Sequence, residues 1–278
     1  LLSTAAHYSP NPSKRELDML LATGEQASVA LMAMTLEEMG VPAVSLTGWQ
    51  AGVGTDETYG GAHIRRLSTE RVRRELGEGK VVLIAGFQGV SPGNDITTLG
   101  RGGSDTTAVA VAAALRADEC RIYTDVEGVF TADPRLIPEA RRLPAVDSEE
   151  MLRLASLGSQ VLHERSAALA LRFGVPLTVL SSLVSAPGTV IRPLPLPEDE
   201  GRLTAVTRSG ALVSLVGTHL HTFDSLPERA VAALREAGLS PDAALLTDGR
   251  LTVHVPEEQI LDTLRCLHAA FLEAKDHS

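Results

Sequence analysis

The stretch Leu99-Gly-Arg-Gly-Gly-Ser-Asp-Thr-Thr107 decides how the rest of the sequence is interpreted. It follows the continuous apolar run VVLIAGF at residues 81–87 and leads into the Ala-rich residues 104–116. The first run is typical of a strand that helices cover on both faces, and the second predicts a buried helix with Ser104 as its N-cap. A Gly-rich loop between such a strand and such a helix indicates a binding site at the carboxyl edge of an α/β sheet.

The residue types in this loop favour an anion. Gly100, Gly102 and Gly103 let the backbone approach a ligand closely and adopt positive φ. A helix beginning near Ser104 offers free N–H groups, and Arg101 adds a planar fork that suits a carboxylate. We therefore expect a carboxylate site rather than a nucleotide phosphate site, the alternative being a Gly-rich turn with a solvated arginine.

A second stretch, Tyr123-Thr-Asp-Val-Glu-Gly-Val-Phe-Thr-Ala-Asp-Pro-Arg135, follows the next predicted strand at the same edge of the sheet. Asp125 is placed to orient Mg²⁺ or a phosphate-binding group, and Arg135 to meet phosphate. Phe130 offers an apolar surface for a base. The alternative is a long surface loop with an acidic turn.

A third stretch, Thr23-Gly-Glu-Gln26, lies where we expect two helices to meet. Glu25 there suits an ammonium group or a catalytic lysine, the alternative being an exposed helix carboxylate. The eight histidines show no ligand spacing, and the two cysteines, Cys120 and Cys266, are far apart. We assign no metal site and no disulfide.

Composition excludes several classes of protein. The 278 residues fit two modest domains or one large one, and the net charge of -10 without a long Lys/Arg cluster argues against nucleic-acid binding. No run of 18 apolar residues and no charged-then-apolar leader is present. We expect a cytoplasmic protein that does not cross a membrane.

Strand and helix signals alternate over residues 1–185 and predict an α/β domain with a large parallel component. Prolines concentrated between residues 187 and 197 indicate a linker at 186–203. Residues 204–278 predict the order β-α-β-β-α, which is a ferredoxin-like plan, with a turn at Asp248–Gly249.

Taken together and in order, these stretches resemble aspartate kinase over about 165 residues, from Glu16 to Ser182. The resemblance rests on ELDMLLATGEQASVALMAM, SLTGWQAGV, VVLIAGFQGV, ITTLGRGGSDTTAVAVAAAL, RIYTDVEGVFTADPR and VPLTVLSS. It implies an amino-acid-kinase-type, largely parallel sheet sandwiched by helices in residues 1–185, and a small ACT-like regulatory domain in residues 204–278.

The resemblance also implies an activity: ATP, with Mg²⁺, phosphorylates the side-chain carboxylate of L-aspartate to give 4-phospho-L-aspartate. This is the first step of lysine, threonine and methionine biosynthesis. Arg101 is expected to clamp the aspartate carboxylate, Glu25 to lie on the substrate side, and Asp105 to help position the catalytic lysine. Gly102, Gly103 and Ser104 are expected to line the substrate pocket. The residues expected at the ATP site are Thr124, Asp125, Phe130, Asp133, Pro134, Arg135 and Gln160.

The sequence departs from the family pattern in three places. The chain starts at Leu1, and nothing before Leu17 resembles the K-[FY]-G-G segment whose lysine contacts the transferred phosphoryl group, so we expect that segment to be missing. Gln160 stands where the family usually has a lysine that approaches ATP. Residues 212–270 resemble only the second of two ACT modules, which leaves feedback inhibition by lysine or threonine an open question.

Two other functions fit the same residues. One is a non-catalytic or degenerate ACT-containing regulatory subunit, and the other is a different carboxylate or phosphate kinase of the same fold. In each case we expect a homodimer through the ACT-like domain, because small βαββα units usually bury a sheet edge against a partner.

Overall fold

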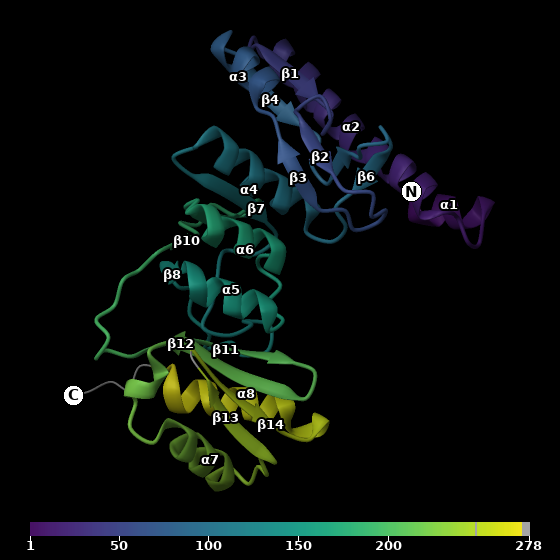
Figure 1. The fold of residues 1–278 in the computed structure, drawn as a ribbon. Helices are drawn as coiled ribbons and strands as arrows, with labels where there is room; N and C mark the ends of the chain where they lie inside the picture. The colour runs from purple at the N-terminus through teal and green to yellow at the C-terminus, as the bar shows by residue number, and fades with distance from the viewer. Residues whose placement is uncertain (248, 274–278) are drawn as a thin grey trace. The chain divides into compact units, whose positions relative to one another are not determined.

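The computed structural model describes residues 1–247 and 249–273, and the chain forms two compact units (Figure 1). The first is Leu1–Cys120 and the second begins at Arg121. Both mix strands with helices, which confirms the expected α/β class. The division falls inside residues 1–185, where one kinase domain was expected, and the domain boundaries inferred from the sequence stay a prediction.

The first unit contains one long helix where two were expected. After the short α1 (Leu2–Tyr8), α2 (Lys14–Glu38) begins at the N-cap Ser13, whose side chain accepts the N–H of Glu16. It ends where Gly40 adopts a φ of 77°. The helix runs unbroken through residues 23–26, so the predicted junction there is wrong. A single glycine, Gly24, does not interrupt a helix whose neighbouring turns are intact.

Polar contacts fix α2 to the strands of its unit. The buried carboxylate of Asp18 accepts the N–H of Gly60 and both the N–H and hydroxyl of Thr98, at 2.6 to 3.1 Å. Gln26 Nε2 donates to Gln88 Oε1 over 3.1 Å. By length and composition alone α2 is a candidate to cross a membrane, but these contacts are those of a helix packed within a domain.

Strands in the first unit form two sheets. β1 (Ala43–Leu46) and β4 (Val81–Ile84) pair in parallel. The other sheet has the order β3-β2-β5-β6, in which β2/β5 is parallel and the remaining pairs are antiparallel. Its strands are β2 (Val53–Thr55), β3 (Ile64–Leu67), β5 (Gln88–Val90) and β6 (Ile96–Thr98).

The apolar run at 81–87 is not one strand buried on both faces. β4 ends at Ile84, Phe87 takes a φ of 67°, and β5 starts at the next residue. Val81 is 41% exposed. The run therefore turns sharply and delivers Gly86 and Phe87 to the start of α4 (Gly103–Leu115). The remaining helix of this unit, α3 (Glu70–Gly77), packs against β4.

The second unit contains a mixed sheet in the order β7-β9-β10-β8, with β8/β10 parallel and β9/β10 antiparallel. Its elements are β7 (Cys120–Thr124), β8 (Ala145–Asp147), α5 (Ser148–Ser156), α6 (Glu164–Phe173), β9 (Leu177–Ser181) and β10 (Thr189–Arg192). Strand β10 lies within residues 186–203, so part of the expected linker is an inner strand. The prolines around β10 indicated a linker, but the four residues of the strand itself include no proline and can form a ladder.

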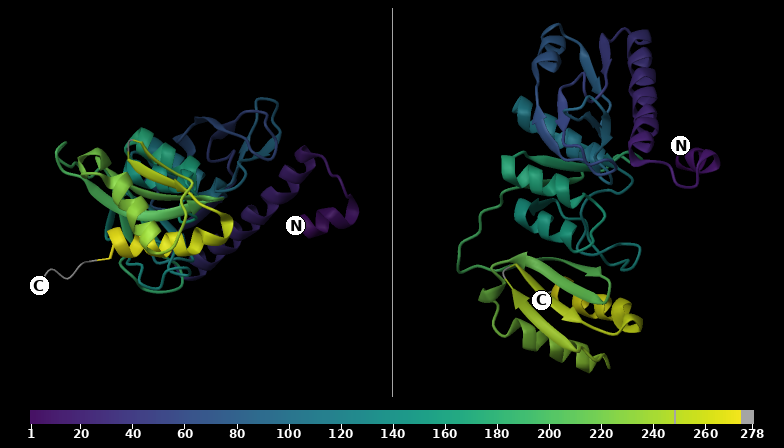
Figure 2. Two further views of the ribbon diagram at one scale, coloured as in Figure 1. Left: turned by 90° about the horizontal axis from the view of Figure 1, so that it is seen from below. Right: turned by 45° about the vertical axis from the view of Figure 1, so that its right-hand side comes forward.

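A second sheet of this unit has the order β11-β12-β14-β13 and is antiparallel throughout (Figure 2). Its elements are β11 (Arg202–Ser209), β12 (Leu212–Thr218), the 3-10 turn η1 (Leu220–Thr222), α7 (Leu226–Glu236), β13 (Ala243–Thr247), β14 (Arg250–His254), the 3-10 turn η2 (Glu257–Gln259) and α8 (Ile260–Phe271). From β12 onward this is the expected β-α-β-β-α order, with β11 added. Of the predicted turn, Gly249 has a φ of 76° and Asp248 lies outside the described residues.

One apolar core holds this sheet and its helices together. Val213 and Leu215 alternate on β12 and point the same way, as strand periodicity requires. Helices α7 and α8 contact each other and the sheet. Ala132 and Ile137, from the loop after β7, belong to the same core. The loop expected to bind nucleotide is therefore packed onto the C-terminal sheet and helices.

Candidate functional site

The Gly-rich loop of the first unit leads into an uncapped helix. Gly100 and Gly102 adopt φ of 74° and 68°, and α4 begins at Gly103 with Gly102 as its N-cap. The prediction of Ser104 as N-cap is wrong by two residues, because only glycine takes this left-handed conformation freely. No side chain caps the helix. Its first turn thus presents N–H groups and the positive end of the helix dipole toward a ligand.

Close packing fixes this helix start against the turn that follows β4. A Cβ on Gly103 would lie 2.8 Å from the Phe87 ring, and one on Gly86 would lie 3.2 Å from the Cα of Ser104. Phe87 N–H donates to Thr107 Oγ1 over 3.1 Å. The glycines are needed because the two backbones touch.

The side chains expected to hold the substrate are available there. Arg101 is exposed, and within the described residues its guanidinium forms no hydrogen bond or ion pair. Ser104 is exposed as well, whereas Asp105 is half-buried and already engaged. A free guanidinium beside an uncapped helix N-terminus can bind a carboxylate.

Glu25 lies in the middle of α2, half-buried, and its carboxylate forms no hydrogen bond or ion pair with the described residues. Its neighbour Gln26 bonds to Gln88, whose amide donates to the carbonyl of Ala22 over 3.0 Å. Gln88 directly follows Phe87. The centre of α2 and the start of α4 are therefore both connected to the turn at residues 86–88.

The turn after β1 contains residues that were not expected at the site. A Cβ on Gly48 would overlap the Gln88 carbonyl, so the turn at Thr47–Gly48 reaches the same place as the turn after β4. β1 and β4 are parallel neighbours, and the carboxyl ends of parallel strands form the usual ligand edge. The sequence contains a signal for this turn, because the hydroxyl residue Thr47 and the glycine Gly48 directly follow the apolar strand β1.

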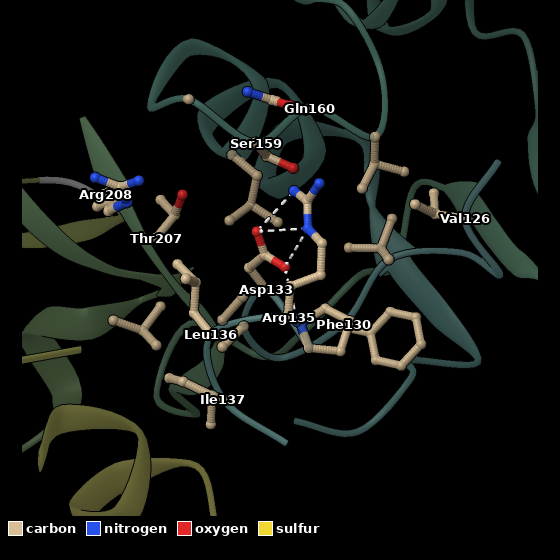
Figure 3. A pocket seen from close by; sticks show the side chains of 18 of the residues that line it. Val126, Phe130, Asp133, Arg135, Leu136, Ile137, Ser159, Gln160, Thr207 and Arg208 are labelled. Atoms are coloured by element: carbon tan, nitrogen blue, oxygen red, sulfur yellow. Dashed lines mark hydrogen bonds and ion pairs between the residues drawn. The ribbon is translucent and has the colours of Figure 1, made fainter. Parts of the chain in front are cut away.

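The second unit contains a cavity of about 370 Å³ (Figure 3). The loop after β7, the turn at residues 158–161 and strand β11 line it. Six of the seven residues expected at the ATP site line this cavity: Asp125, Phe130, Asp133, Pro134, Arg135 and Gln160. The seventh, Thr124, ends β7 and donates its hydroxyl to Asp125 Oδ1 over 3.1 Å.

Asp133 and Arg135 form a closed pair inside this cavity. Arg135 Nε bonds both carboxylate oxygens at 3.0 and 3.3 Å, and Nη2 bonds Oδ2 at 2.8 Å. Hydrogen bonding to the Arg135 side chain is the main reason why the pKa of Asp133 is lower than usual. The Asp133 carboxylate in turn raises the pKa of Arg135. Arg135 is therefore already paired with a carboxylate, although its side chain stays 73% exposed.

Strand β11 contributes four cavity residues that were not expected from the sequence: Ala205, Val206, Thr207 and Arg208. Val206 N–H donates to the Thr131 carbonyl over 2.8 Å, which holds β11 on the loop. A Cβ on Gly158, whose φ is 99°, would lie 2.6 Å from the Arg208 carbonyl. No local signal announces this contact, because it joins segments that lie dozens of residues apart.

No group of three or more His, Cys, Asp or Glu side chains in the described part of the chain is arranged to hold a metal ion. The rings of His219 and His221 are 5.9 Å apart, beside a separate hollow that Glu198, Leu246 and Thr247 also line. Asp125 is an exposed carboxylate at the cavity.

Residues 2–181 match the amino acid kinase family, and the chain belongs to this family. Within the family its sequence is similar to aspartokinases. It is 56% identical to the aspartokinase of Geobacillus stearothermophilus over 192 residues, which are 69% of this chain and 47% of that protein. It is 49% identical to the aspartokinase of Mycolicibacterium smegmatis over 250 residues, which are 88% of this chain and 59% of that one. The chain thus spans about half to three-fifths of the length of these relatives.

Solved structures agree with this placement. The fold resembles that of E. coli aspartokinase III in complex with aspartate and ADP, with a TM-score of 0.84 and 22% identity over 98% of this chain and 79% of that one. It also resembles aspartate kinase from Synechocystis, with a TM-score of 0.61 and 36% identity over 99% of this chain and 48% of that one. The expected resemblance to aspartate kinase is confirmed.

Proposed function

We propose that this chain is part of an aspartate kinase that uses ATP to phosphorylate the side-chain carboxylate of L-aspartate. The main support is the similarity of the sequence to aspartokinases, together with two groups of residues, one in each unit, whose chemistry suits the two substrates. Arg101 lies beside the uncapped start of α4, which suits an anion, and six of the residues expected at the nucleotide site line one cavity. The similarity to aspartokinases gives the substrate its identity.

The proposed reaction is an in-line transfer. An oxygen of the aspartate side-chain carboxylate attacks the γ-phosphorus of ATP, the bond to the β–γ bridging oxygen breaks, and ADP leaves. The product is an acyl phosphate. A carboxylate is already a nucleophile at neutral pH, so the protein needs no general base and acts by positioning and charge neutralisation. Arg101 would clamp a substrate carboxylate, and Glu25 would meet the substrate ammonium group.

Mg²⁺ fits the residues present as a metal that the nucleotide brings with it. Such ions keep several waters and bind phosphate oxygens plus one or two carboxylates, so a dedicated cluster of protein ligands is not required. Asp125 is the cavity carboxylate that is not already paired with an arginine, and it would hold the ion. The metal would neutralise charge on the transferring phosphoryl group.

A hydroxylamine trap tests this proposal. Wild-type protein supplied with ATP, Mg²⁺ and aspartate should form aspartyl hydroxamate. Arg101→Ala should raise the KM for aspartate by about 10- to 100-fold, because a charge-assisted hydrogen bond contributes about 1.5–3 kcal/mol. Arg66→Ala, at an exposed arginine of β3, serves as the control and should behave as wild type.

Three results would contradict the proposal in different ways. Absence of aspartate-dependent hydroxamate from active-site-titrated protein would reject the kinase function. Hydroxamate formed from another carboxylic acid in preference to aspartate would favour a different kinase of this fold. An unchanged KM in Arg101→Ala would remove Arg101 from the substrate site.

One observation favours the second candidate, a non-catalytic regulatory subunit. Gln160 lines the cavity as a neutral side chain at a position where aspartate kinases usually carry a lysine. In that case ATP would bind without turnover.

For the catalytic candidate we further propose a cytoplasmic enzyme at the first step of lysine, threonine and methionine biosynthesis.

A further inference from the structure

The cavity of the second unit has little positive charge to offer a polyanionic ligand. Among its lining residues the cations are Arg135 and Arg208, and the acids are Asp125 and Asp133. Arg135 is tied to Asp133 by three contacts of 2.8 to 3.3 Å. Gln160 carries no charge. A nucleotide therefore finds one cation in this lining that is not already paired, which is Arg208.

The guanidinium of Arg208 is available to a ligand. Its side chain is exposed, and it forms no hydrogen bond or ion pair with any residue that the structure describes. Its charge does reach the centre of the cavity, because it helps to lower the pKa of Asp133 after the larger effect of Arg135. It lies on one side of the Asp133–Arg135 pair with Thr207, whereas Phe130 and Val126 lie on the other (Figure 3).

Backbone contacts hold the Cα of Arg208 beside the cavity. Arg208 pairs with Val213 in the β11–β12 ladder. Two residues earlier, Val206 donates to the Thr131 carbonyl, and Gly158 passes close to the carbonyl of Arg208 itself. These contacts fix the backbone of Arg208 beside the cavity, so that only its side chain has to be ordered when a ligand binds.

We propose that Arg208 is a nucleotide-binding residue that contacts the anionic groups of ATP and supplies the positive charge that Gln160 does not. This rests on the proposed function for the identity of the ligand. The two ends of the cavity then have separate roles: the apolar side with Phe130 and Val126 receives the base, and the side with Arg208 receives phosphate. Arginine suits this because its planar fork forms two hydrogen bonds to phosphate oxygens.

The test is calorimetric titration of the whole chain with ATP and, separately, with adenosine. Arg208→Ala should weaken ATP about 10-fold or more, in line with the loss of a charge-assisted phosphate contact, and leave adenosine unchanged. Adding Gln160→Lys to Arg208→Ala should restore a large part of the ATP affinity, because a lysine at 160 returns a cation to the same cavity. Arg235→Ala, at an exposed arginine of α7 outside the cavity, is the matched control.

Unchanged ATP affinity in Arg208→Ala would overturn the proposal. Equal weakening of ATP and adenosine would overturn it too, since it would make Arg208 a structural or base contact. Failure of the wild-type chain to bind ATP would likewise reject it. By contrast, a phosphate-selective loss in Arg208→Ala together with no aspartyl hydroxamate from the wild type would support the role of Arg208 and reject the kinase function alone.

Discussion

Glu75, on α3, shows how one buried acid is stabilised by its neighbours. Its side chain is 6% exposed and contacts Lys80 Nζ at 2.7 Å and Arg71 Nε at 2.6 Å. These two hydrogen bonds, that of Lys80 first, lower the pKa of Glu75 from 4.5 to about 2. The ionised form is thus favoured in the folded protein more than in the unfolded chain.

This shift predicts a loss of stability in acid. Because the folded pKa is lower than the unfolded one, the contribution of Glu75 is complete above pH 4.5 and disappears as the pH falls toward 2. Urea unfolding between pH 2 and 6 should show a smaller acid-induced decrease in Glu75→Gln than in wild type. Glu70→Gln, at an exposed acid of the same helix, should follow the wild-type curve. Parallel curves for wild type and Glu75→Gln would contradict the prediction.

Single residues also show which of the expected nucleotide residues the fold brings together: Asp125, Phe130 and Arg135 line one cavity. Asp125, Phe130 and Arg135 come from one continuous motif, and a motif carries its own local geometry into the fold. Arg208 could not be found in this way, because nothing near it in sequence indicates a ligand. It reaches the cavity only through the long-range pairing of β11 with the loop.

Among the elements, α5 is joined to the C-terminal sheet by a buried carboxylate. Glu150 is fully buried, and its Oε1 accepts Arg202 Nη2 at 3.0 Å and the Thr218 hydroxyl at 2.6 Å. Arg202 and Thr218 stand opposite each other on β11 and β12. One side chain of the helix therefore holds both strands.

We predict that Glu150→Ala lowers the free energy of unfolding by about 2 to 4 kcal/mol, because it leaves Arg202 and Thr218 without their acceptor. Guanidinium denaturation followed by circular dichroism measures this. Glu149→Ala, which removes an exposed pair with Arg153, should cost under about 1 kcal/mol. A similar loss in the free energy of unfolding for Glu150→Ala and Glu149→Ala would contradict the prediction, because burial of the Glu150 contacts would then add nothing.

The elements themselves were predicted unevenly. The order of β12, α7, β13, β14 and α8 was expected, since alternating apolar residues and turn residues mark these elements. Two helices were expected in place of α2 because Thr23–Gly24 resembles a helix break. Tertiary contacts support the helix there, so it continues through these residues. β10 was missed because its four residues lie among prolines.

At the scale of the whole molecule, the sequence predicted the α/β class and a closing β-α-β-β-α sequence of elements. It did not predict that the chain divides into compact units at Cys120. Contacts between segments far apart in sequence decide such a division, and composition does not record them. The expected substrate residues lie in the first unit and the expected nucleotide residues in the second.

We also predict a homodimer. β13 is an edge strand of the C-terminal sheet, and its Leu245 is 63% exposed. An edge with an exposed apolar residue favours pairing with a second copy. Light scattering at micromolar concentration should give twice the monomer mass, and Leu245→Asp should reduce it toward the monomer. Leu183→Asp, at a 75% exposed leucine outside the sheet, is the control. A monomeric wild type would contradict this prediction.

The hydrogen bond between Thr131 Oγ1 and His268 Nε2, 2.9 Å long, joins residues 137 positions apart. Ala132 and Ile137 of the same loop share a core with Leu267 of α8. During synthesis the loop leaves the ribosome well before α8, by about 10 to 30 s at ordinary elongation rates. The cavity is therefore completed only after α8 has emerged. A nascent chain stalled before α8 should therefore not retain a nucleotide at this cavity, whereas one stalled after α8 should.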